Sequence, residues 1–289
     1  MALIGKRNLL AVVREAPPGL YLDGGTHGEI LLPGRYIDRS KPLPASIDVF
    51  VYRDSEDRLV ATPQAPYAMV GEFAFLRVVG MNPKAGVFLE WGLEKDLLLP
   101  IREQGGPLRV DDWLVVHVSL DERTDRIVAS SRLARRFSTT PPTYADDQPV
   151  RLLVYAESPL GYKAIVNHAH SGLLYRSELG ESLAIGQSLD GFVRTVRADG
   201  KIDLALQPSG YRRIAPLTEQ VLEALSVSGG RMPYHDKSTP DEIRSAFGVS
   251  KKAFKQAIGA LYRDRKIELL PDAIRLAASK TSPHPSPRP

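Results

Sequence analysis

The chain has 289 residues, enough for two large domains or for several small ones built from a repeat. It contains no cysteine, which excludes disulfides, thiolate nucleophiles, iron–sulfur clusters and zinc sites with sulfur ligands. The net charge is +4 and the basic excess is C-terminal: residues 213–289 hold 13 Lys and Arg against 8 Asp and Glu, while residues 1–212 hold 25 against 26. Because no run approaches the roughly 18 apolar residues of a membrane span, we expect a cytoplasmic protein without a membrane partner.

Three segments repeat one pattern of short apolar runs. Each opens on a glycine, contains a Leu-Leu pair, and ends on an apolar run that follows a basic residue. The step from the glycine to the residue after the Leu pair is 14 in all three, and the next step, to the basic residue, is 25, 26 and 26. In chain order the apolar runs are 19–22, 31–33, 47–52 and 57–62; 86–89, 98–100, 114–118 and 125–130; and 161–164, 173–175, 189–193 and 200–205.

These runs are rich in β-branched and aromatic residues and are broken by Gly, Pro and Asp, which is typical of strands joined by tight turns. Residues 55–57, 122–125 and 198–200 are expected to be hairpin loops. A unit of about 60–70 residues is too small for a sandwich of two full sheets, whereas a small closed sheet removes its own edges. The repeat therefore predicts three five-stranded barrels in tandem.

Beyond residue 213 the apolar period becomes helical. Helices are expected over 217–225, from the capping sequence at 238–242 to Gly248, and from Ser250 through 261. The runs 266–270 and 273–276, joined by Pro-Asp, predict a two-stranded wing. Three helices followed by a hairpin form the winged-helix arrangement.

The predicted fold class is mainly β and multidomain, with three tandem five-stranded barrels followed by an α/β winged-helix domain. The expected domains are barrel one at 1–66, barrel two at 67–137, a Thr- and Pro-rich linker at 138–149, barrel three at 150–212, the winged helix at 213–278 and a disordered, proline-rich tail at 279–289.

The third unit resembles the OB-fold repeat of the large RNA-binding protein of the small ribosomal subunit. The resemblance rests on Gly161-Tyr162-Lys163-Ala164, on Gly172-Leu173-Leu174-Tyr175-Arg176-Ser177-Glu178-Leu179 and on Gly200-Lys201-Ile202-Asp203-Leu204. The first two units are less similar, because they carry Pro33 and Pro100 in place of a His or an aromatic residue and lack the Ser-Glu-Leu.

Three such barrels followed by a winged helix resemble the conserved virulence factor B family of bacterial RNA-binding proteins, over residues 1 to about 278. The resemblance implies RNA binding without catalysis, with effects on gene expression after transcription. It also implies a binding face, matched here by position to Tyr21 and Arg58 in barrel one, to Phe88, Trp91 and Arg126 in barrel two, and to Lys163, Tyr175 and Lys201 in barrel three, with added charge from Arg194 and Arg197.

Such a face holds a single strand because aromatic rings stack on bases and basic groups follow the phosphates. The alternative is that these aromatic residues belong to the barrel cores. Phe88 and Trp91, three residues apart, fall on opposite faces of a regular strand. In barrel three Lys163 replaces the first aromatic residue, which favours a grip on phosphate rather than on a base.

The winged helix offers a second set of basic residues: Lys251, Lys252, Lys255, Arg263, Arg265 and Lys266. They would serve RNA or duplex DNA equally, so a DNA-binding transcription regulator is the alternative function, while the barrels favour single-stranded RNA. Winged helices also dock proteins, and the near-neutral barrels keep a protein-docking role open.

Catalytic readings have little support, so we expect no enzyme, no metal and no cofactor. His168 and His170 lie two apart, but a metal site needs three or four ligands. The glycine-rich sequence at 24–28 is followed by no Lys-Ser/Thr and no helix, so we interpret it as a hairpin turn. The acid pair at 146–147 lies in the expected linker, and no Gly-x-Ser-x-Gly elbow is present.

Overall fold

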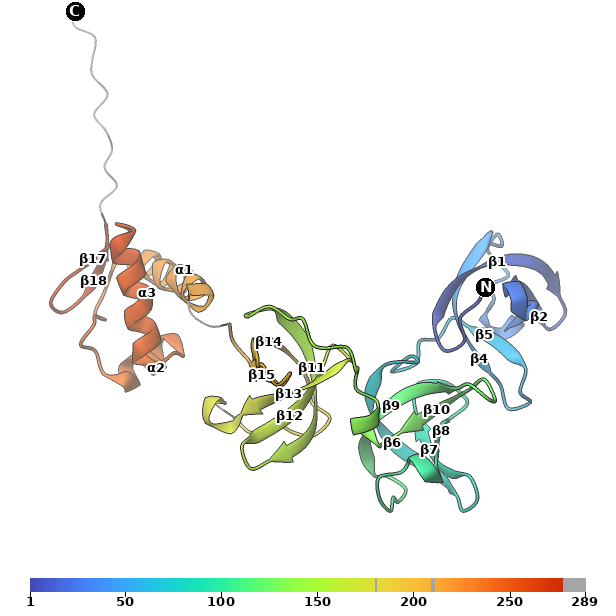
Figure 1. The fold of residues 1–289 in the computed structure, drawn as a ribbon. Helices are drawn as coiled ribbons and strands as arrows, with labels where there is room; N and C mark the ends of the chain where they lie inside the picture. Colours follow the sequence, from blue (N-terminus) through green and yellow to red (C-terminus); the bar gives the residue numbers. More distant parts are fainter. Residues whose placement is uncertain (180, 209–210, 278–289) are drawn as a thin grey trace, which may run out of the picture. The chain divides into compact units, whose positions relative to one another are not determined.

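A computed structural model of the chain describes residues 1–179, 181–208 and 211–277, so the predicted tail at 279–289 lies outside the described residues. The chain divides into two compact units, Met1–Leu206 and Gln207–Pro289. The first contains three closed barrels of five strands, and the second contains helices and a three-stranded sheet (Figure 1). The predicted fold class is confirmed.

All three barrels share one strand order, in which the third strand lies between the second and the fifth. The third and fifth strands pair in parallel and the other neighbours are antiparallel. Barrel one is formed by β1 (Arg7–Ala16), β2 (Gly19–Asp23), β3 (Glu29–Pro33), β4 (Ser46–Arg53) and β5 (Leu59–Thr62). Barrel two is formed by β6 (Phe73–Asn82), β7 (Gly86–Glu90), β8 (Leu97–Pro100), β9 (Trp113–Asp121) and β10 (Arg126–Ser130). Barrel three is formed by β11 (Pro149–Ser158), β12 (Gly161–Val166), β13 (His170–Tyr175), β14 (Ser188–Val196) and β15 (Ile202–Ala205).

The opening glycine of each repeat is required by a close approach of two backbones. Gly19, Gly86 and Gly161 have φ values of +150°, +138° and +151°, and a Cβ on any of them would lie 2.0–2.2 Å from a carbonyl oxygen of the facing strand. No side chain fits there. The constant spacing of 14 residues reflects this geometry, because the glycine is paired directly with the residue after the Leu pair.

The predicted hairpin loops are also confirmed. Asp57 and Asp125 adopt the left-handed conformation in the loops β4–β5 and β9–β10, and Gly200 does so between β14 and β15. The glycine-rich turn at 24–28 contains a short 3₁₀ helix, Gly25–His27, between β2 and β3. A bulge interrupts the first strand of every barrel, which bends that strand around the core.

Apolar side chains join the barrels of the first unit. Phe50, Tyr52 and Val60 of barrel one belong to the same buried cluster as the core of barrel two. A further buried cluster of Phe73, Val115, Leu153 and Ile165 connects barrel two to barrel three. In the segment predicted as a linker, Tyr144 packs against the core of barrel three, and its hydroxyl lies 2.8 Å from Nδ1 of His170.

His117 on β9 is a half-buried histidine beside these aromatic side chains. Its ring meets Phe73 edge-on, with 4.7 Å between the ring centroids, and its Nδ1 has no hydrogen-bond partner among the described residues. Burial, assisted by the charge of Arg136, lowers the pKa of His117 to about 4 from an ordinary 6.5. The folded chain therefore keeps this histidine neutral at pH values where the unfolded chain protonates it.

We expect the stability contributed by neutral His117 to be complete above pH 6.5 and to be lost as the pH falls to about 4, because only the unfolded state then gains the proton. The thermal midpoint of the wild type should fall further between about pH 7 and pH 4 than that of a His117→Gln variant. Equal falls in the two proteins would contradict this assignment.

The second unit is built on α1 (Tyr211–Val227), α2 (Pro240–Phe247) and α3 (Lys251–Arg263), with strands β16 (Arg231–Met232), β17 (Ile267–Leu269) and β18 (Ile274–Leu276). Thr239 forms a capping box with Glu242 at the start of α2, and Gly248 ends that helix in the left-handed conformation. The Ser250 hydroxyl caps α3 by accepting the Ala253 amide. The polar cap at the start of α2, the end of that helix at Gly248 and the cap of α3 at Ser250 were predicted from the sequence.

The sheet of this unit has one strand more than the predicted two-stranded wing. Its order is β16-β18-β17, so the short strand after α1 pairs with the second strand of the hairpin, which becomes the central strand of the sheet. A strand of two residues carries no alternation to detect in the sequence. The described part of the chain contains no helix long and apolar enough to cross a membrane.

Candidate nucleic-acid interface

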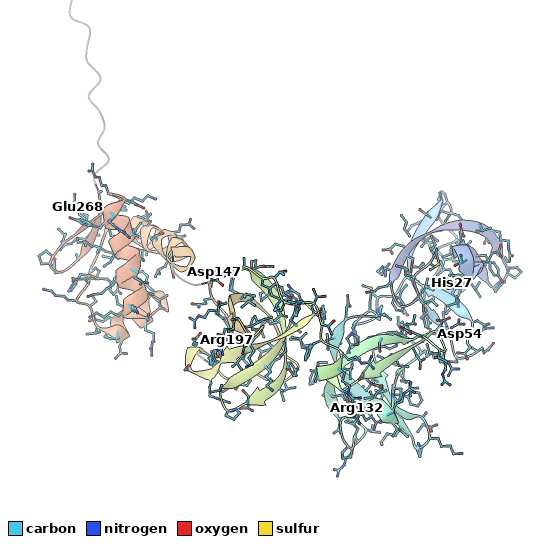
Figure 2. All side chains as sticks on the ribbon, viewed as in Figure 1. His27, Asp54, Arg132, Asp147, Arg197 and Glu268 are labelled. Carbon is cyan, nitrogen blue, oxygen red and sulfur yellow. The ribbon has the colours of Figure 1, made fainter. Side chains whose placement is uncertain are left out.

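Barrel three carries an open groove over β12, β13 and β15, with a volume of about 680 Å³. Strand pairing places Lys163, Leu173 and Asp203 side by side across it. Tyr175 lies two residues after Leu173 on β13, and Arg197 and Lys201 flank the loop between β14 and β15. Figure 2 labels Arg197 on this barrel. Four predicted residues of barrel three therefore line one groove: Lys163, Tyr175, Arg197 and Lys201.

Carboxylates hold most of the cations at this groove. Arg197 donates from Nε to Asp203 Oδ2 over 2.8 Å, and Lys201 Nζ lies 2.7 Å from Asp199 Oδ2. The hydrogen bond to Asp203 raises the pKa of Arg197, and that from Lys201 lowers the pKa of Asp199. Arg194 is paired with Glu178 and lies outside the residues that line the groove.

Lys163 differs from these cations. Its side chain is exposed, and it forms no ion pair with any residue that the structure describes. An anion that reaches the groove would therefore meet Lys163 without having to displace a carboxylate.

The corresponding face of barrel two is covered by barrel one. Phe88 and Arg126 line a smaller cavity of about 230 Å³ together with Tyr52 and Arg53 of barrel one. Phe88 is half-buried there. The face that lies open in barrel three is thus, in barrel two, part of the contact with barrel one.

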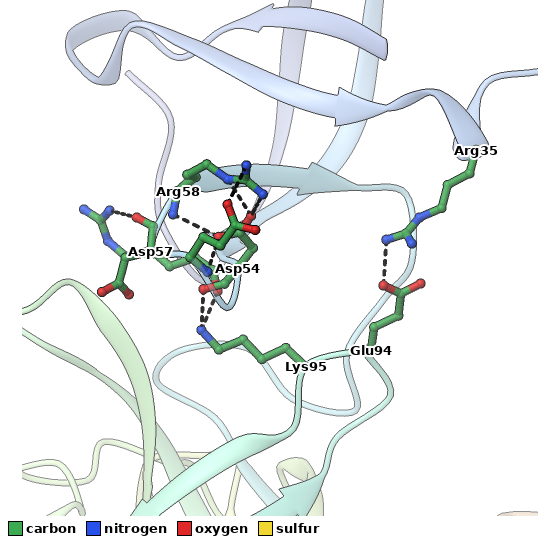
Figure 3. A network of polar contacts seen from close by, with 8 residues as sticks. Arg35, Asp54, Asp57, Arg58, Glu94 and Lys95 are labelled. Carbon is green, nitrogen blue, oxygen red and sulfur yellow. Dashed lines mark hydrogen bonds and ion pairs between the residues drawn. The ribbon is translucent and has the colours of Figure 1, made fainter. Parts of the chain in front are cut away.

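Polar contacts at this junction centre on the acidic β4–β5 loop (Figure 3). Asp57 Oδ1 accepts from Arg126 Nε over 2.8 Å, and Lys95 Nζ donates to the carbonyl oxygens of Arg53 and Asp54 over 3.0 and 2.6 Å. The pKa of Asp57 is lowered by its hydrogen bonds from Arg126, while burial lowers the pKa of Lys95. Arg126, predicted to bind phosphate, is bound to a carboxylate of barrel one instead.

The prediction that Trp91 contributes to the RNA-binding face is wrong. Its side chain is only 3% exposed, its indole N–H donates to the Lys95 carbonyl over 2.6 Å, and its ring meets Phe50 of barrel one edge-on at 5.9 Å. No base can stack on it. The three-residue offset from Phe88 was the signal in the sequence, since residues at that spacing fall on opposite faces of a regular strand.

In barrel one the predicted aromatic and basic residues lie apart. The guanidinium of Arg14 covers the ring of Tyr21 at 3.8 Å from its centroid and also binds Glu29. Arg58 lies at a separate groove of about 720 Å³, paired with Asp54 at 2.7 Å and Glu56 at 2.8 Å. Tyr21 is not among the residues that line that groove.

On the winged helix the predicted cations surround α3. Lys252 and Lys255 are exposed in its first half, whereas Lys251 is half-buried and donates to the Lys237 carbonyl over 3.4 Å. The others are exposed at the end of α3 and before β17: Arg263, Arg265 and Lys266. Helix packing thus leaves a basic strip on the outer side of α3.

The two histidines considered as a metal pair make other contacts. His168 Nδ1 accepts the Phe73 amide over 3.0 Å, and His170 Nε2 lies 2.9 Å from the Thr140 carbonyl. Both therefore take part in packing around barrel three.

Asp203 was not predicted from the sequence as a residue of the groove. It lies two residues after Lys201, and that spacing puts two side chains on the same face of a strand.

Comparison with known proteins shows what the chain is similar to. Residues 219–276 match a family described as the CvfB-like winged helix domain, and residues 4–64 match the S1 domain. The uncharacterized protein YitL of Bacillus subtilis is 28% identical over 269 residues, covering 91% of this chain and 90% of YitL. Conserved virulence factor B of Staphylococcus epidermidis is 23% identical over 232 residues, 76% of each chain. A crystal structure from Streptococcus pneumoniae TIGR4, described as a multidomain protein with nucleic acid binding domains, is 23% identical and covers 94% of this chain and 98% of its own, with a TM-score of 0.40.

The fold and these matches define a multidomain protein in which three five-stranded barrels, the first of them matching the S1 domain, precede a winged helix. Both are nucleic-acid-binding classes of domain. The S1 match falls on barrel one. In the sequence, the resemblance to the ribosomal OB-fold repeat was based on barrel three, which contains the Ser-Glu-Leu sequence that barrel one lacks. The resemblance to the conserved virulence factor B family is confirmed by the winged-helix match and by relatives of that name across most of the chain.

Proposed function

We propose that the chain is a non-enzymatic, cytoplasmic RNA-binding protein that regulates gene expression after transcription and holds single-stranded RNA in the groove of barrel three. The observation that carries the proposal is the convergence of Lys163, Tyr175, Arg197 and Lys201 on that groove. The S1 match and the domain order support nucleic acid as the partner. An OB-type barrel offers its central strands to single strands, whose unstacked bases are open to aromatic side chains.

The charges of the groove indicate how it would bind. A base stacks on Tyr175 while the phosphates follow Lys163 and Lys201 at the rim. Because Lys201 is already paired with Asp199, it gains less from a phosphate than an unpaired lysine does. We therefore expect binding by barrel three to depend more on stacking and less on salt than a simple count of cations suggests.

Titration of a labelled single-stranded RNA of about ten nucleotides, at several salt concentrations, tests the proposal. We expect the affinity to fall with rising salt, and a Lys163→Ala variant to bind more weakly with a salt slope smaller by about 1. Lys84→Ala, which removes an exposed lysine from the β6–β7 turn, is the matched control and should bind like the wild type. No binding at micromolar protein, or an affinity unaffected by salt, would contradict the proposal.

The basic strip on α3 favours a second candidate, a DNA-binding transcription regulator. In this alternative α3 enters the major groove of a duplex, and Lys252 and Lys255 lie in its first half, where recognition helices contact DNA. Charge reversal of both lysines in the full chain separates the two functions. Loss of duplex DNA binding with unchanged RNA binding would favour the DNA regulator, whereas a wild type that binds RNA and no duplex favours the first proposal.

A further inference from the structure

The groove of barrel three has a carboxylate at its centre. Asp203 on β15 is paired in parallel with Leu173, and beyond Leu173 lies Lys163. The residues in the same pairing position of barrels one and two are Val60 and Val128. Barrel three thus differs from barrels one and two by a carboxylate in the middle of the face proposed to hold RNA.

The orientation of this carboxylate is fixed by two donors. Asp203 Oδ1 accepts from the Tyr175 hydroxyl over 3.2 Å, and Oδ2 accepts from Arg197 Nε over 2.8 Å. Its side chain is 13% exposed, so part of it faces the groove. A carboxylate oxygen has two lone pairs, and each oxygen of Asp203 therefore keeps one acceptor position. Two acceptors lie side by side at the hydroxyl edge of the Tyr175 ring.

The free positions of this carboxylate accept hydrogen bonds and cannot donate to a phosphate oxygen, so their favourable partner in a single strand is a donor on a base. Cytosine, adenine and uracil each place an acceptor beside the donor on their Watson–Crick edge, and this acceptor would face a carboxylate oxygen. Guanine alone presents two adjacent donors, N1–H and the 2-amino group, which match the two oxygens of a carboxylate.

We propose that Asp203 binds the Watson–Crick edge of a guanine stacked on Tyr175, which makes barrel three selective for guanine-containing RNA. This inference rests on the proposed function, because it requires single-stranded RNA in the groove. If Asp203 only positioned Arg197 and Tyr175, its removal would change the affinity for every RNA by the same factor. A base contact predicts instead that the change depends on the base.

The experiment compares fluorescence anisotropy titrations of the full chain with three RNAs of about ten nucleotides: oligouridine, the same strand with one central guanosine, and the same strand with inosine there. Inosine lacks only the 2-amino group. We expect the guanosine strand to bind about fivefold more tightly, or more, than either of the other two. Because this comparison alters the RNA, it does not depend on the folding of a variant.

Asp203→Asn then assigns the preference to the residue. An amide has one acceptor and one donor, so we expect the guanosine preference to fall below about twofold. Asp199→Asn is the matched control, since it removes an exposed carboxylate paired with Lys201, and it should keep the preference. Binding without a guanosine preference, or a preference kept in Asp203→Asn, would overturn this inference and leave the proposed function standing. Failure of all three RNAs to bind would overturn both.

Discussion

Replacement of Trp91 by alanine is expected to lower the free energy of unfolding of the first unit by about 3–5 kcal/mol. The indole is buried between the core of barrel two and Phe50 of barrel one, in a cluster shared by both barrels. Its loss opens a cavity at that junction and leaves the Lys95 carbonyl without its indole donor. Urea unfolding followed by circular dichroism measures the effect.

The chain provides a matched control in its second tryptophan. Trp113 is 55% exposed and its ring packs on Phe75 at 5.2 Å, so Trp113→Ala should cost less than about 1 kcal/mol. Similar losses in the two variants would contradict a structural role specific to Trp91. We also expect Trp91→Ala to keep most of the affinity for RNA at temperatures where it remains folded, because Trp91 lies outside the groove of barrel three.

The second large effect concerns Tyr175. Tyr175→Ala should weaken the binding of single-stranded RNA by about 5- to 150-fold, the loss of one stacked base. The substitution also removes a hydroxyl that donates to Asp203, and Tyr175→Phe separates the two contributions because it keeps the ring. We expect Tyr175→Phe to retain most of the affinity. Equilibrium titration at a fixed salt concentration measures both variants.

Tyr21→Ala is the corresponding control in barrel one. Arg14 covers the ring of Tyr21, and that ring lies outside the groove next to Arg58, so we expect a change in affinity below about twofold. An equal loss in Tyr21→Ala and Tyr175→Ala would show that the barrels share the RNA and would contradict the central role given to barrel three.

The fold could be predicted from the sequence because its determinants are local. The opening glycines, the Leu pairs and the hairpin aspartates recur at fixed spacing, since each barrel requires the same close approach and the same left-handed turns. Capping residues at Thr239 and Ser250 defined the helix starts in the same way, through hydrogen bonds to backbone amides three residues on. The two-residue strand β16 escaped because it is defined only by its partner β18.

The candidate site was predicted in part. Matching by position selected three residues that do line the groove of barrel three, Lys163, Tyr175 and Lys201. The same matching selected Trp91, which is buried, and Arg126, which binds Asp57 of barrel one. Equivalent positions in the three repeats thus have different surroundings. A repeat pattern carries the shape of each barrel and says nothing about the neighbour that packs against it.

The sequence by itself determined the number of barrels, their closing turns and the winged helix, because glycine conformation, strand alternation and helix caps depend on residues close together in the chain. Only the tertiary structure decided which barrel keeps an open face and which cations are neutralised by carboxylates. Both depend on contacts between side chains far apart in the sequence, such as Arg126 with Asp57 across 69 residues, and no local pattern records them.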